Sequence, residues 1–195
     1  AGTQLRGIAA NTIGRLIGVG LGTVVIGTGT AWRVTMCRFP GSRMLQWALL
    51  LPLVMPTYII GYAYADLLTF AGPVQSALRA TMGWSRDDYW SPNFGSAQGV
   101  ALLFTLVLYP YVYLAARAAF LAQSQSLLEA SRILGNGPWR TFLRIGLPLA
   151  RPAIAAGVAL ALMETLADFG TVQYYGIQTF TTAIYRTWFG MGDRV

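Results

Sequence analysis

The sequence predicts an all-α protein, a polytopic bundle of transmembrane helices with a short helical hairpin on its cytoplasmic side. Hydrophobic residues make up 55% of the 195 residues and charged residues only 11%, well below the roughly 25% typical of soluble domains. Long apolar segments recur along the chain, and the arginines are concentrated between them. A soluble helical protein would need more charge than this to cover its surface.

Composition also limits the chemistry that the chain can carry. All 14 basic residues are arginines and there is no histidine, which removes the commonest general base and metal ligand. The single cysteine, Cys37, excludes an internal disulfide and a cysteine-based metal cluster. The net charge of +7 comes from arginines between apolar segments, a distribution typical of membrane topology and not of a nucleic-acid-binding face. We expect no catalytic residue, no cofactor, no metal site and no nucleic-acid partner.

Four segments approach the roughly 20 apolar residues that a helix needs to cross a bilayer core of about 30 Å. They are 11–32, 44–70, 97–121 and 147–168, all within a single transmembrane domain, 1–195. The first is rich in Gly and Thr, which favours close approach of helices. In the second, Pro52 and Pro56 predict a kink or a broken helix. The fourth is the weakest, because Arg151 and Glu164 bracket its apolar centre.

The gaps between these segments predict the sidedness of the chain. The first gap carries three arginines and no acid, and the third gap with its flanking residues, 117–151, carries five arginines against Glu129. The gap between them, 66–96, has two arginines against three aspartates, and we expect one short helix in it around 74–82. Because cytoplasmic loops are enriched in arginine, the first and third gaps are predicted to be cytoplasmic. Arg6 and Arg15 fall on the outer side in this scheme and count against it.

The third gap, segment 122–146, is predicted to form two short amphipathic helices joined by a tight turn. Ser126 and Glu129 have the spacing of a capping box, which predicts the start of a helix. Gly135 stands where a left-handed residue would end that helix, and Gly137 and Pro138 fit the start of a second one. From these residues alone, a hairpin lying on lipid headgroups explains the segment equally well.

Residues 129–148, EASRILGNGPWRTFLRIGLP, resemble the cytoplasmic signature of permeases of binding-protein-dependent ABC importers. That signature is Glu-Ala-Ala, three residues, Gly, nine residues, Ile, one residue and Leu-Pro. Six positions match and Ser131 replaces the second Ala; the matching residues are Glu129, Ala130, Gly135, Ile145, Leu147 and Pro148. The resemblance implies the type I ABC importer permease fold. It also implies that the segment forms coupling helices seated in a groove of an ATPase subunit, with Glu129 as a polar contact and Gly135 as the turn.

Nearly the whole chain is similar to the ferric-iron branch of these permeases, in the N-terminal half of its two-module subunits. The stretches that carry this likeness are 36–42, 51–68, 108–120 and 164–189. The resemblance implies an inner-membrane, multi-pass subunit that moves ferric iron, as part of a longer protein. Its partners would be a dimeric cytoplasmic ATPase, a periplasmic substrate-binding protein and a second permease module. Branches for thiamine, phosphonate, polyamines and sulfate share parts of these stretches, so their substrates remain alternatives.

Three acids lie at the predicted outer ends of the spans: Asp66 after the second, and Glu164 and Asp168 on one face of the fourth. Acids that border a span usually face a cavity or a partner, so they predict a translocation path or the contact with the binding protein. The alternative is that Asp168 caps the next element, or that the acids pair with arginines. A function of another class would be a membrane-embedded enzyme that uses Glu164 and Asp168. Against it, the sequence contains no histidine, no nucleophile motif and no phosphate-binding loop.

Overall fold

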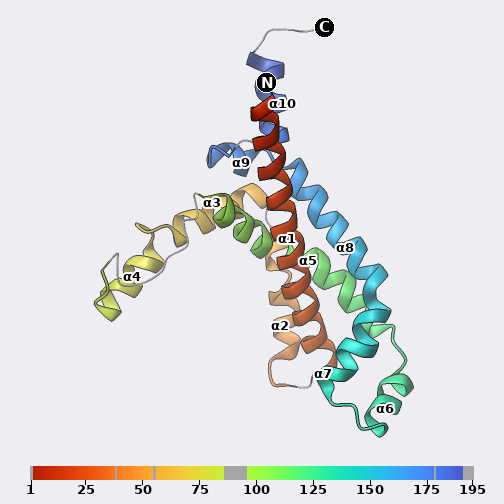
Figure 1. Ribbon diagram of the computed structural model, residues 1–195. Coiled ribbons are helices and arrows are strands. Elements are labelled where there is room, and N and C mark those ends of the chain that lie inside the picture. Colours follow the sequence, from red (N-terminus) through yellow and green to blue (C-terminus); the bar gives the residue numbers. More distant parts are fainter. Residues whose placement is uncertain (1, 38, 55, 86–95, 178, 191–195) are drawn as a thin grey trace.

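The structure, a computed structural model, describes residues 2–37, 39–54, 56–85, 96–177 and 179–190 (Figure 1). These residues form helices and no strand, which confirms the all-α prediction. In chain order the elements are α1 (Gly2–Met36), α2 (Ser42–Ala48), the 3-10 turn η1 (Leu51–Val54), α3 (Thr57–Leu68), α4 (Pro73–Met82), α5 (Ala97–Leu121), α6 (Gln125–Ile133), α7 (Pro138–Thr141), the π-helical turn η2 (Phe142–Gly146), α8 (Leu147–Ala167), α9 (Gly170–Tyr174) and α10 (Phe180–Gly190).

Three helical runs in the described residues are long and apolar enough to cross a membrane: α1, α5, and the run from Pro138 to Ala167 that contains α8. Helix α5 packs against both α1 and α8. Its most apolar window is 61% buried, against 22% and 28% for the other two runs, so α5 is the central helix of the bundle. The apolar faces that α1 and α8 turn outward suit contact with lipid or with further protein.

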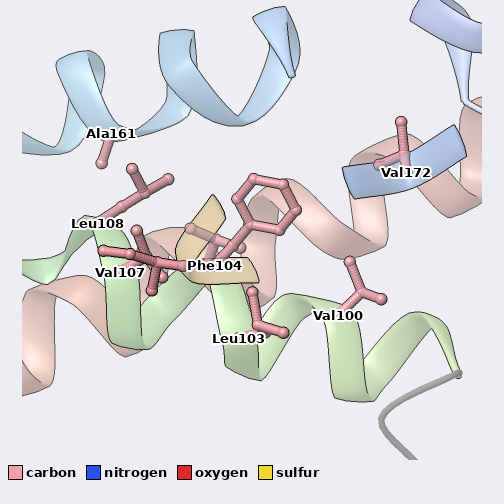
Figure 2. Packing of buried hydrophobic residues seen from close by; sticks show 9 residues of the cluster. Val100, Leu103, Phe104, Val107, Leu108, Ala161 and Val172 are labelled. Atoms are coloured by element: carbon pink, nitrogen blue, oxygen red, sulfur yellow. The ribbon is translucent and has the colours of Figure 1, made fainter. Parts of the chain in front are cut away.

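Two hydrophobic clusters hold the bundle together. The outer cluster surrounds Phe104 of α5 and includes Ala161 of α8 and Val172 of α9 (Figure 2). The inner cluster lies at the end that carries α6 and α7; it joins Ala31, Phe120, Phe142, Ala150 and Ile154. Since each cluster contains residues of α5 and α8, these helices are fixed to each other near both ends.

Glycines allow α1 to lie very close to α5. A Cβ atom on Gly22 would stand 2.5 Å from Cγ2 of Thr105, and one on Gly27 would stand 2.8 Å from Cβ of Val112. Both distances are shorter than real Cβ contacts, so a larger residue at either position would force its neighbours on α5 to shift. The small residues of the first apolar segment therefore serve helix–helix packing, as expected.

The second apolar segment is broken, as its prolines predict. Pro52 lies in η1, and Pro56 stands directly before α3, so neither residue interrupts the interior of an α-helix. The segment consequently contains no single helix of membrane-spanning length among the described residues.

Two tyrosines of α5 hold this broken segment in place. The Tyr109 hydroxyl donates to the carbonyl oxygen of Leu49 at 3.0 Å, and the Tyr113 hydroxyl donates to that of Gln46 at 3.3 Å. These carbonyls belong to the C-terminal end of α2, where the helix leaves its acceptors unsatisfied. The two hydroxyl groups thus hold α2 against α5.

The other helices differ from expectation mainly at their ends. Helix α5 coincides with 97–121, α8 ends one residue before the expected 168, and α4 lies at the expected 74–82. Helix α1 extends beyond 11–32 in both directions and includes Arg6 and Arg33. Four charged residues that entered the prediction of sidedness lie outside the described residues: Arg38, Arg86, Asp87 and Asp88.

Candidate coupling segment and outer polar cluster

The N-terminus of α6 is capped by Ser124. The helix starts at Gln125, and the backbone N–H of Leu127 donates to Oγ of Ser124 at 3.4 Å. The predicted capping box of Ser126 and Glu129 is therefore wrong, because Ser126 already lies inside the first turn. Its hydroxyl lies 3.2 Å from Oγ of Ser124, so two nearby serines could cap the helix and the earlier one does.

The turn between α6 and α7 follows the prediction. Gly135 has a φ of +79°, in the left-handed region that favours glycine. The backbone N–H of Asn136 donates to the carbonyl oxygen of Ser131 at 3.1 Å, the long hydrogen bond of a Schellman motif. Pro138 then occupies the first turn of α7, where its missing N–H has no consequence.

A buried pair of hydroxyls joins the two arms of this hairpin. Oγ of Ser131 on α6 lies 3.0 Å from Oγ1 of Thr141 on α7, and the two residues are 2% and 4% exposed. Ser131 is the position at which the chain departs from the Glu-Ala-Ala signature. Its hydroxyl thus adds a hydrogen bond across the hairpin that an alanine could not make.

The second arm of the hairpin is continuous with α8. Helix α7 passes through η2 into α8 with helical backbone angles throughout, so Leu147 and Pro148 lie within one helical run. The backbone N–H of Leu147 donates to the carbonyl oxygen of Phe142, five residues earlier. This wider turn fits a proline at position 148, which cannot donate to the carbonyl four residues before it. The second helix of the hairpin and the apolar segment expected at 147–168 therefore form one helical run, Pro138–Ala167, while α6 is a separate helix as expected.

Aromatic contacts fix this run to the bundle. The Trp32 ring of α1 lies 5.0 Å from the Phe142 ring and 5.3 Å from the Phe120 ring. A Cβ atom on Gly146 would stand 2.5 Å from the Trp32 ring, so glycine is required for this contact. Nε2 of Gln123 donates to the carbonyl oxygen of Gly146 at 2.9 Å. The hairpin is therefore joined to α1, α5 and α8.

The hairpin leaves large apolar side chains exposed, and we call these four residues the apolar tip. They are Ile133 at 86%, Leu134 at 80%, Trp139 at 71% and Leu143 at 56% exposure. Exposed apolar side chains gathered on a short projecting element commonly mark a protein–protein contact. Figure 1 places the α6–α7 hairpin at one extremity of the molecule.

The seven predicted coupling residues divide between surface and packing. Glu129, Ala130 and Gly135 are exposed, Ser131 is buried, and Ile145, Leu147 and Pro148 are half-buried. The first half of the signature thus lies on the free arm of the hairpin, and the second half connects it to the fourth span.

At the opposite end of the molecule, Asp168 ends α8 and caps α9. One of its carboxylate oxygens accepts from the backbone N–H groups of Thr171 at 3.0 Å and Val172 at 3.4 Å, and the other accepts from the Thr171 hydroxyl at 3.1 Å. The alternative in which Asp168 caps the next element is therefore the arrangement observed.

Arg15 lies close to Asp168, inside the bundle. The side chain is 3% exposed, and its Nη2 donates to the carbonyl oxygen of Thr165 at 3.1 Å. Its guanidinium carbon lies 5.4 Å from the centre of the Phe104 ring. Within the described residues, Nε and Nη1 are buried and have no hydrogen-bond partner.

We call Arg15, Thr165, Asp168 and Thr171 the outer polar cluster. The other two predicted acids do not belong to it. Glu164 on α8 and Asp66 on α3 are both exposed. Among the described residues, no three His, Cys, Asp or Glu side chains are grouped so that they could hold a metal ion. The three acids thus differ in environment, and only Asp168 is tied into a network.

Sequence reasoning missed Arg15 and Thr141. A charge within an apolar segment is expensive and usually functional, so Arg15 carried a signal, but it entered only the prediction of sidedness. Thr141 had no signal, because its partner Ser131 is ten residues away on another helix.

Comparison with known proteins assigns this chain to a family. Residues 16–190 match the family described as "Binding-protein-dependent transport system inner membrane component". The chain is 34% identical over 141 residues to the molybdenum transport system permease protein ModB of Escherichia coli K12, which covers 72% of this chain and 58% of that protein. It is 30% identical over 179 residues to the Fe(3+)-transport system permease protein FbpB 2 of Haemophilus influenzae, covering 92% of this chain and 31% of that protein.

A third relative, the sulfate transport system permease protein CysT of Escherichia coli K12, is 31% identical over 153 residues, with 76% of this chain and 50% of that protein covered. The chain therefore spans less than two thirds of each of these relatives. They are transport permeases and not enzymes, which gives no support to the alternative of a membrane-embedded enzyme. Because the match covers most of its length, the chain belongs to the family of inner-membrane components of binding-protein-dependent transport systems.

Proposed function

We propose that this chain is part of the permease of an ABC importer and that its α6–α7 hairpin is the docking element for a cytoplasmic ATPase subunit. The family's description implies a substrate-binding protein as a further partner. We propose a second permease module as well. The observation that carries the proposal is the combination, in one hairpin, of an exposed apolar tip and firm anchoring to three helices of the bundle.

Such a hairpin suits the transmission of force. The Ser131–Thr141 hydrogen bond holds its two arms together, and the Trp32–Phe142 contact fixes the second arm to α1. Because α7 continues into α8 without a break, movement of the tip would displace a whole span. An interfacial hairpin that only lies on lipid headgroups would not need this anchoring.

We assign the contact with the ATPase subunit to exposed residues of the hairpin. Leu134 and Trp139 provide apolar area for a groove of the partner, and Glu129 provides a charged group beside it. Desolvated aromatic and aliphatic anchors usually supply most of the energy of such an interface. Arg140 and Arg144, both exposed on the second arm, would flank the contact.

For the substrate we propose ferric iron. The support is the Fe(3+)-transport relative, whose similarity extends over 92% of this chain. A second candidate is an oxyanion such as molybdate or sulfate, because the relatives named for these substrates match 72% and 76% of the chain.

The docking proposal is tested with the complete transporter reconstituted in proteoliposomes. We expect L134S combined with W139S to weaken ATPase binding at least tenfold and to reduce substrate-driven uptake to the same degree, since each anchor is worth about 1 kcal/mol or more. Met82 on α4, which is 55% exposed, provides the matched control M82S. Binding and uptake that equal those of M82S would refute the proposal.

The substrate is tested in cells that lack the gene and are complemented with the full-length protein. Uptake of radiolabelled ferric iron should be restored, and excess molybdate, sulfate, thiamine or phosphonate should not reduce it. Restoration of molybdate or sulfate uptake without iron uptake would favour the oxyanion candidate.

A further inference from the structure

The outer polar cluster contains a mismatch between donors and acceptors. Arg15 is almost fully buried, yet two of its three nitrogen atoms, Nε and Nη1, have no hydrogen-bond partner in the part of the chain that the structure describes. A buried cation with unsatisfied donors is costly, and in most proteins it is compensated by a carboxylate. The guanidinium instead has one backbone acceptor, the Thr165 carbonyl, and the face of Phe104.

The acid that could compensate Arg15 is committed elsewhere. Asp168 follows Thr165 by three residues, so its backbone lies about one helical turn beyond the carbonyl that Arg15 contacts. Both carboxylate oxygens nevertheless accept from Thr171, and one also accepts from the N–H of Val172.

Asp168 stands at a point where its direction can change. Helix α8 ends at Ala167, and Asp168 itself is extended, with a ψ of 118°. A rotation at this residue would exchange hydrogen bonds at the α9 N-terminus for bonds to Nε and Nη1 of Arg15. The lost bonds are charge-assisted, and so would be the bonds gained.

Helix α9 links this exchange of partners to α3. The Tyr62 hydroxyl of α3 donates to the carbonyl oxygen of Gly170 at 3.4 Å, and a Cβ atom on Gly61 would contact the Thr171 side chain at 3.3 Å. The buried Val172 keeps α9 in the outer cluster whichever partner Asp168 has. Release of the cap would therefore loosen the first turn of α9 against α3 without detaching the helix.

We propose that Asp168 alternates between two partners, the N-terminus of α9 and the guanidinium of Arg15, and that this exchange switches the outer end of the bundle between two states. The described structure is the state in which α9 is capped. In the other state Arg15 is paired, α1 and α8 are tied by an ion pair, and α9 is free to move against α3. The role of the switch in transport rests on the proposed function, but its existence does not.

Hydrogen exchange of the α9 amides tests the switch in the full-length permease in lipid nanodiscs. D168N keeps a capping side chain but removes the charge that Arg15 would pair with, so the uncapped state is lost. We expect exchange of the Thr171 and Val172 amides to slow at least about threefold in D168N, because local opening controls it. R15Q should slow it likewise, and D168A, which cannot cap, should accelerate it.

A purely structural role predicts a different pattern. If Arg15 only braces the bundle and Asp168 only caps α9, D168N exchanges as fast as the wild type or faster, because a neutral amide caps more weakly than a carboxylate, and R15Q exchanges faster. That result would overturn the proposal, and D168N decides the question even if R15Q fails to insert. In the reconstituted transporter we also expect D168N to reduce uptake without changing ATPase binding. Slowed exchange with normal uptake would retain the switch and remove its role in transport.

Discussion

The Ser131 hydroxyl lies 3.0 Å from the Thr141 hydroxyl, and this contact joins the two arms of the coupling hairpin. Both residues are buried, and α6 and α7 are otherwise separated by the Gly135 turn. The geometry of the apolar tip therefore depends on a polar pair beneath it.

Removal of one partner of this pair should loosen the hairpin. S131A leaves the Thr141 hydroxyl buried without its cross-hairpin partner, at a cost of about 1–3 kcal/mol. We expect faster hydrogen exchange in residues 126–141 and weaker ATPase binding, and addition of T141V should restore part of the loss. T81V is the control, because among the described residues Thr81 bonds to carbonyls of its own exposed helix. Equal exchange in S131A and T81V would contradict the account.

Substitution by alanine should be tolerated less well at Gly135, in the turn, than at Gly137. G135A forces an alanine into the left-handed region at φ +79°, which costs about 1–2 kcal/mol. Gly137 has a φ of −67°, and a Cβ atom on either glycine would meet no other atom within 4 Å, so G137A is a matched control. We expect reduced ATPase-coupled uptake for G135A alone; a G137A defect of the same size would show that the left-handed turn is not what matters.

The contact between the π-helical turn and α1 should be sensitive to a single methyl group. G146A places a Cβ atom against the Trp32 ring and must displace it, at about 1–3 kcal/mol. Gly29 of α1 has no atom within 4 Å of the equivalent position, so G29A should be nearly neutral. Thermal unfolding in detergent measures both variants, and indistinguishable midpoints would argue against tight packing at Trp32.

The packing of α1 on α5 gives a similar test within the bundle. G27A would bring a Cβ atom to 2.9 Å from the backbone nitrogen of Tyr113, and backbone cannot move aside as a flexible side chain does. We expect a clearly lower unfolding midpoint or poor insertion. G14A, with open space around Gly14, should behave as the wild type. A harmless G27A would mean that α1 can shift away from α5.

The features that the sequence could predict are those that depend on local pattern. Length and hydropathy located α5 and α8, and Pro52 and Pro56 located the break in the second segment. The left-handed Gly135 and the Pro138 helix start follow from the backbone restrictions of these two residue types. These restrictions act within a few residues, so a single sequence contains them.

What the sequence left undetermined depends on distant contacts. The cap of α6 was assigned to Ser126 because two nearby serines satisfy the same pattern, and only the path of the chain after α5 selects Ser124. The partner of Tyr109 lies 60 residues away and that of Arg15 lies 150 residues away. Such pairs exist only once the helices have packed.

The central claim is that the apolar tip contacts the ATPase, and site-directed cross-linking tests it most directly. The single native cysteine, Cys37, is exposed and is first replaced in C37S. L134C, carrying a photoreactive cross-linker in the complete transporter, should then form a covalent adduct with the ATPase subunit, and M82C on α4 should not. An adduct from M82C but not from L134C, in a transporter that still hydrolyses ATP, would contradict the account.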